Sequence, residues 1–152
     1  MKKSVFLSNF LIFFFPLYFF TTCTRELTVY ASFRQIERGR WKQDQEYTCE
    51  VLLEDSILLH HIDITGRFKY TYPFDSLSLA VTVTAPSGGS FCDTLSFGLT
   101  NSRHQLWGEF RFPYCSGVRF TEKGVWRFSF CHNMEEETLH GVTAIGVFIE
   151  VQ

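Results

Sequence analysis

Apolar and polar residues alternate along most of the chain beyond residue 26, and a period of two is typical of strands with one buried face. The clearest run covers residues 77–84, where Leu and Val alternate with Ser, Ala and Thr. Comparable runs cover residues 47–54, 68–74, 125–130 and 145–151, and weaker ones cover residues 27–34 and 106–112. Trp126, Phe128 and Phe130 share one face of their run, so we expect all three side chains to be buried.

Turn-forming residues separate these runs. The strongest signal is Ala-Pro-Ser-Gly-Gly at 85–89, and weaker signals occur at 122–124 and 37–39. Residues 133–141 are polar and acidic, which favours a turn or a single helical turn. No long stretch has helical periodicity. Seven or eight short strands joined by turns predict an all-β fold, an antiparallel β-sandwich.

The N-terminus has the order of charged, apolar and small residues that is typical of a secretory signal. Lys2 and Lys3 come first, residues 10–20 are almost wholly apolar, and Thr21 and Thr22 lead to Cys23. A membrane-spanning helix needs about 20 apolar residues, whereas this run is shorter and contains Pro16. The pattern therefore favours an export signal over a retained helix.

Cys23 sharpens this prediction, because an apolar stretch, two small residues and a cysteine resemble a lipoprotein signal. The cysteine thiol of such a signal receives diacylglycerol, and acyl chains bind a membrane with about 0.8 kcal/mol per buried methylene. The alternative is an ordinary secretory signal that ends near a cysteine. We expect a lipoprotein signal peptide at residues 1–22, lipidation of Cys23, and a single β-sandwich domain with a short N-terminal tether at residues 23–152.

Charge argues against binding to nucleic acid. The net charge of −2 becomes −4 once Lys2 and Lys3 are removed, and no basic stripe is present. Four cysteines follow Cys23, namely Cys49, Cys92, Cys115 and Cys131. No C-x-x-C spacing occurs among them, which argues against a structural zinc site. An oxidising compartment allows three ways of pairing them in disulfides, and four free, buried thiols are the other interpretation.

Residue types that carry catalysis are present but not in a catalytic pattern. His60 and His61 are adjacent and point to opposite faces of a strand, while His104, His132 and His140 are scattered. No G-x-S-x-G motif occurs. The spacing selects no pair among four candidate carboxylates (Asp63, Asp75, Asp93, Glu109), and Glu135, Glu136 and Glu137 favour a solvated loop. We expect no metal, no cofactor and no enzymatic activity.

Aromatic residues offer a binding hypothesis. Five of them are candidates to line a surface for glycan or peptide, with packing in the core as the other interpretation: Tyr30, Trp41, Tyr70, Tyr72 and Trp107.

Several segments together resemble the GldH family of gliding-motility-associated lipoproteins of Bacteroidetes. They are F-K-Y-T-Y-P-F-D-S-L-S-L-A-V at 68–81, Cys92-Asp93-Thr94, Leu106-Trp107-Gly108, and the aromatic strand, methionine turn and final strand of residues 124–150. The resemblance implies a β-rich, non-catalytic lipoprotein of the cell envelope. Its partners would be the membrane, through the lipid anchor, and envelope proteins of a motility or secretion complex.

The residues after Cys23 bear on which side of the membrane the domain faces. Only one acidic residue follows Cys23 directly, in Thr24-Arg25-Glu26, which favours a domain that faces the periplasm. The alternative function is an envelope module that binds glycan or peptide, and a small hydrolase comes third because no convergent carboxylates or metal ligands support it.

Overall fold

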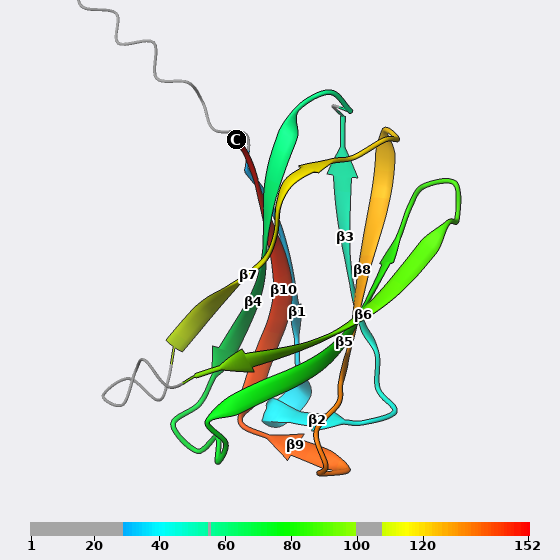
Figure 1. The fold of residues 1–152 in the computed structure, drawn as a ribbon. Coiled ribbons are helices and arrows are strands. Elements are labelled where there is room, and N and C mark those ends of the chain that lie inside the picture. Colours follow the sequence, from blue (N-terminus) through cyan, green and yellow to red (C-terminus); the bar gives the residue numbers. More distant parts are fainter. Residues whose placement is uncertain (1–28, 55, 100–107) are drawn as a thin grey trace, which may run out of the picture.

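The computed structural model describes residues 29–54, 56–99 and 108–152. These residues form ten strands, arranged as two four-stranded sheets that face each other and a two-stranded ribbon at one end (Figure 1). The signal segment, Cys23, His104 and Trp107 lie outside the described residues. No helix in the described part of the chain has the length and apolar character required to cross a bilayer.

All strand pairings are antiparallel, which confirms the predicted all-β sandwich. The first sheet has the order β1 (Val29–Gln35), β10 (Val142–Val151), β4 (Leu59–Phe68) and β7 (Gly108–Arg119). The second has the order β3 (Tyr47–Leu53), β8 (Gly124–His132), β5 (Ser76–Thr84) and β6 (Ser90–Gly98). A 3₁₀ turn, η1 (Glu37–Gly39), leads into the ribbon of β2 (Arg40–Lys42) and β9 (Thr138–His140).

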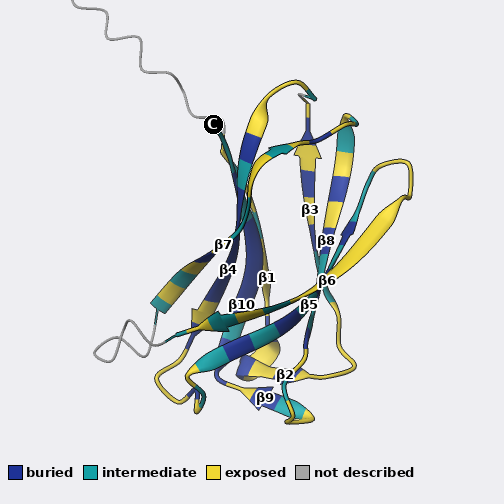
Figure 2. Cartoon of the chain, in the orientation of Figure 1, coloured by how far each residue is buried: buried dark blue, intermediate teal, exposed yellow. Residues whose placement is uncertain are grey.

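Side chains from the facing sides of the two sheets form the core (Figure 2). Trp126, Phe128 and Phe130 are buried, as the alternation in their run predicts. The central strand β5 alternates in the same way, with four buried apolar residues facing the core and half-buried small residues between them. A period of two in the sequence thus marks the strands that have only one buried face.

Residues 68–74 were predicted as a strand, and the structure corrects this. Strand β4 ends at Phe68, and the chain turns at once, with the Tyr72 amide donating to the Lys69 carbonyl at 3.0 Å. Phe68, Tyr72 and Phe74 pack edge to face in this connection, with ring centroids 5.0 and 5.6 Å apart. Aromatic residues two apart therefore mimic a strand. Strand β4 itself is buried on both faces over 62–66, so it lacks the alternation that marks its neighbours.

The strand register defines two opposite ends of the sandwich. Glu150 pairs with Val29 on one side and with His61 on the other, so the start of β1, the start of β4 and the end of β10 lie together. We call this the Val29 end, and we call the opposite end, which carries β2 and β9, the ribbon end (Figure 1). At about 3.4 Å per step, the nine steps of the ten-residue strand β10 span about 30 Å from one end toward the other.

Candidate functional site

The ribbon is fixed to the end of the core by its two central residues. Trp41 of β2 and Leu139 of β9 are cross-strand partners, and both side chains are fully buried. The Trp41 indole donates to the Gln45 carbonyl at 2.8 Å and meets the His132 ring edge to face at 5.6 Å. Because side chains alternate along a strand, burial of Trp41 and Leu139 directs their neighbours away from the core.

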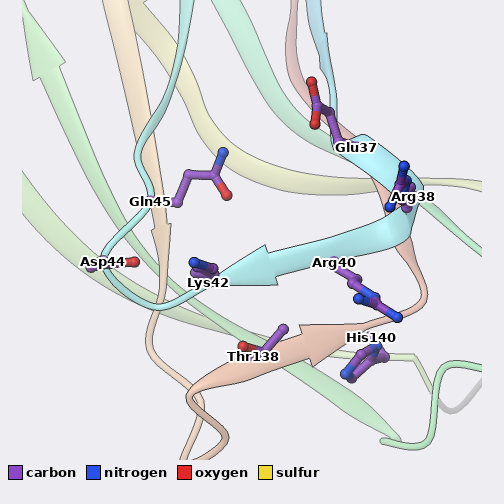
Figure 3. Close-up of a pocket in the computed structure, with 8 residues that line it drawn as sticks. All are labelled: Glu37, Arg38, Arg40, Lys42, Asp44, Gln45, Thr138 and His140. Carbon is purple, nitrogen blue, oxygen red and sulfur yellow. The ribbon is translucent and has the colours of Figure 1, made fainter.

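These outward side chains line an open hollow of about 740 Å³ at the ribbon end (Figure 3). Arg40 faces His140 across the ribbon, and Lys42 faces Thr138. The remaining lining residues come from η1 and from the turn after β2, and they are Glu37, Arg38, Asp44 and Gln45. The ion pairs of the described residues all lie elsewhere, so the charges of the hollow are available to a partner.

The hollow has three permanent cations, Arg38, Arg40 and Lys42, against two carboxylates, Glu37 and Asp44. Arg38 adopts a left-handed conformation with φ of 54°, which costs an L-residue about 1–2 kcal/mol. A cation-rich surface suits a partner that presents carboxylates, because arginine and lysine form strong charge-assisted hydrogen bonds with them. Basic residues occupy every second position at 38, 40 and 42, but this short pattern does not reveal the pairing with β9 that forms the hollow.

The structure keeps the described histidines apart. His132 is buried, and its Nε2 atom lies 3.0 Å from the Trp41 carbonyl oxygen. His60 is fully buried against Phe120, with ring centroids 5.1 Å apart. His61 lies on the outer face of β4, where its Nε2 atom is 2.8 Å from Asp63 Oδ1. Among the described residues, no three His, Cys, Asp or Glu side chains form a group that could hold a metal ion.

The four candidate carboxylates are also separated. Asp63 pairs with His61, and Glu109 on β7 pairs with Arg67 at 3.1 Å. Asp75 and Asp93 are exposed at other places, before β5 and on β6. The segment Glu135–Glu137 is an exposed turn whose last carbonyl accepts a hydrogen bond from the Gln43 amide.

Of the aromatic candidates for a binding surface, two belong to the core. Trp41 and Tyr72 are buried, while Tyr30 is half-buried at the edge of the first sheet. Tyr70 is exposed in the connection between β4 and β5. The four candidate rings in the described part of the chain are therefore not gathered on one face.

The four cysteines of the described residues are free thiols. Cys49 is buried between the sheets, Cys115 and Cys131 are half-buried, and Cys92 is exposed on the edge strand β6. Burial raises the pKa of Cys49, Cys115 and Cys131, and Asp93 raises that of Cys115 further. A thiol with a raised pKa is largely protonated and weakly nucleophilic at neutral pH.

The fold and the hollow together define a small antiparallel β-sandwich whose ribbon end offers a charged surface. Residues 28–149 match the model of the GldH lipoprotein family. The chain belongs to this family.

Two curated relatives agree with the match. The gliding motility lipoprotein GldH of Flavobacterium johnsoniae is 28% identical over 124 residues, which cover 72% of this chain and 77% of the relative. The gliding motility lipoprotein GldH homolog of Christiangramia forsetii is 26% identical over 153 residues, which cover 91% and 93%. Among solved structures, dimeric latent PorU from Porphyromonas gingivalis superposes with a TM-score of 0.36 and 10% identity. The match covers 83% of this chain but only 13% of that one.

Proposed function

We propose that this protein is a lipid-anchored, non-catalytic component of the machinery for gliding motility and its associated secretion, and that it acts through protein contacts. The family match over residues 28–149 carries the proposal, because the curated relatives are named gliding motility lipoproteins. Cys23 would carry the acyl chains, and the domain would face the periplasm. The hollow at the ribbon end would be the contact surface for an envelope protein.

Three structural features support a role in contact over a role in catalysis. His60 and His132 pack in the core, His61 is paired with Asp63, and the half-buried or buried thiols have raised pKa values. None of these groups combines exposure with a raised reactivity that would favour catalysis. The charges of Arg40 and Lys42, in contrast, stabilise nothing within the described chain through an ion pair.

Lipidation is tested by Cys23→Ala. The variant should leave the membrane fraction and lose function, because an anchor brings the domain to its partners at high effective concentration. Fractionation and mass spectrometry of the N-terminus give the result. Continued membrane retention with an uncleaved N-terminus would contradict lipidation.

The contact surface is tested by complementation of a deletion strain, scored for motility or secretion together with protein level. Arg40→Gln with Lys42→Gln should reduce function, because the hollow loses two cations that a partner would contact. The matched control is Arg67→Gln with Arg127→Gln, which removes the same charge from exposed pairs with Glu109 and Glu50. Equal function in the two double variants would contradict the assigned surface.

The non-catalytic role has a separate test in the same strain. Single substitutions His61→Ala and Asp63→Asn, which lie away from the hollow, should preserve function. A stable, correctly anchored variant of this set that has lost all function would contradict the proposal.

A further inference from the structure

Exposed apolar side chains gather at the Val29 end. They come from three connected parts of the fold: the start of β1, the cross-strand pair Leu52–Val125 of β3 and β8, and the connection from β3 to β4. We call them the apolar end patch, and its members are Val29, Leu52, Ile57, Leu58, Leu59 and Val125. Six of the nine exposed large hydrophobic residues in the described part of the chain belong to this patch.

Residues 57–59, which lead from this connection into β4 at the Val29 end, include the most exposed member of the patch (Figure 1). Ile57, Leu58 and Leu59 are consecutive, and 74% of Ile57 is exposed. Loops are ordinarily polar because they lie in water, and isolated exposed apolar residues need no explanation. A contiguous apolar group at a loop tip is different, because such groups mark contacts with proteins or membranes.

The tether determines which surface this patch meets. Five residues, 24–28, lie between Cys23 and Val29, so the six steps from one Cα atom to the other span at most about 22 Å when fully extended. Val29 lies at the same end of the first sheet as Leu59, two strands away at about 4.8 Å per strand. A lipid on Cys23 therefore keeps the apolar end patch close to the bilayer, whichever direction the tether takes.

We propose that the apolar end patch inserts into the surface of the bilayer that holds the Cys23 lipid, with the strands upright and the ribbon end directed away from the membrane. This inference rests on the lipid anchor of the proposed function. The tether alone allows the sandwich to lie on its side, whereas insertion of Ile57, Leu58 and Leu59 selects one orientation. The charged hollow then stands about 30 Å from the membrane surface, where an envelope protein can reach it.

The insertion is apolar and not electrostatic. Charges of both signs border the patch, with Arg119 opposite Leu59, Lys123 before Val125, and Glu54 after Leu53. The contact should therefore be the same on neutral and on anionic vesicles, unlike that of a basic helix that needs anionic lipid.

The test uses the full lipidated protein, reconstituted in vesicles of phosphatidylcholine with and without phosphatidylglycerol. Ile57→Trp places an indole in the patch, and Tyr70→Trp is the matched control, because Tyr70 is 72% exposed and lies away from the Val29 end. Brominated phosphatidylcholine should quench the added emission of Ile57→Trp severalfold more than that of Tyr70→Trp. Equal quenching of the two variants would overturn the inference, as would a requirement for phosphatidylglycerol.

A measurement on the parent sequence needs no substitution. Hydrogen exchange at the amides of residues 56–59 should slow severalfold when the lipidated protein enters vesicles, while exchange at residues 69–72 should not change. Unchanged exchange at residues 56–59 would overturn the inference. Failure of the anchor is a separate result, since an unlipidated protein would not float with the vesicles at all.

Discussion

The Nε2 atom of His132 lies 3.0 Å from the carbonyl oxygen of Trp41, 91 residues earlier in the chain. Because a carbonyl oxygen only accepts, the neutral ring must carry its proton on Nε2. This hydrogen bond connects the last residue of β8 to the centre of β2, so it joins the second sheet to the ribbon.

This buried histidine predicts a loss of stability at mildly acidic pH. Burial lowers the pKa of His132 from 6.5, and the hydrogen bond to Trp41 acts in the opposite direction. Below pH 6.5 the unfolded chain therefore binds a proton that the folded chain resists, so the free energy of unfolding falls as the pH falls. In His132→Gln this dependence should be weaker than in the parent, by thermal unfolding between about pH 7.5 and 5.5. Identical pH dependence of unfolding in the parent and in His132→Gln would contradict this prediction. The control is His140→Gln, which removes an exposed histidine and should keep the pH dependence of the parent.

The aromatic face of β8 should dominate the stability of the core. Phe128 is fully buried, so Phe128→Ala should lower the free energy of unfolding by about 3–5 kcal/mol. Phe91→Ala is the control, because Phe91 is exposed on the edge strand β6 and should change stability by less than about 0.5 kcal/mol. Denaturant titration of both variants measures the difference. A loss below about 1 kcal/mol in Phe128→Ala would contradict the buried face.

Close approach of β1 to β10 makes Gly146 sensitive to any side chain. A Cβ atom at this position would collide with the Ser32 carbonyl oxygen and lie 2.7 Å from Phe33 Cδ1. Gly146→Ala should therefore cost about 1–3 kcal/mol by overpacking. Gly89→Ala is the matched control, since nothing lies within 4 Å of its Cβ position. If Gly146→Ala and Gly89→Ala unfolded at the same denaturant concentration, this prediction would be wrong, because β1 could then shift without a loss of stability.

His60 should be replaceable by an apolar residue. Its side chain is fully buried, and neither ring nitrogen has a hydrogen-bond partner within the described residues. A buried polar group without a partner costs about 1–3 kcal/mol, so His60→Leu should be neutral or more stable than the parent. A complementation assay should show full function. Destabilisation by more than about 1 kcal/mol would mean that the ring is hydrogen-bonded in solution.

The fold was predictable where a strand has one buried face. In β5 and β8, Leu77 and Phe128 lie in alternating patterns that the sequence displays directly. In β4, Asp63 and Thr65 are buried although they point away from the core, so both faces of this strand exclude water and the alternation disappears. In residues 68–74, aromatic residues stand two apart because they pack together in a connection. This spacing has the same period as a strand, which explains the wrong prediction.

The hollow was not predictable, for a physical reason. A three-residue strand has too few positions to display a period, and β2 and β9 lie far apart in the sequence. Only their pairing places Arg40 beside His140 and Lys42 beside Thr138. These charges come together only because β2 and β9 pair in the folded chain. Neither the composition nor the spacing within one segment encodes that pairing.

The path of the chain from the tether to the ribbon has a mechanical consequence. Strand β1 runs from Val29 at one end to Gln35 at the other and continues through η1 directly into β2. A load applied between the membrane and the hollow would therefore act along β1. It would slide this strand parallel to β10 and strain all seven paired positions, from Val29–Glu150 to Gln35–Ala144, at the same time. Such a load would have to break the seven paired positions together, whereas peeling would break them one after another.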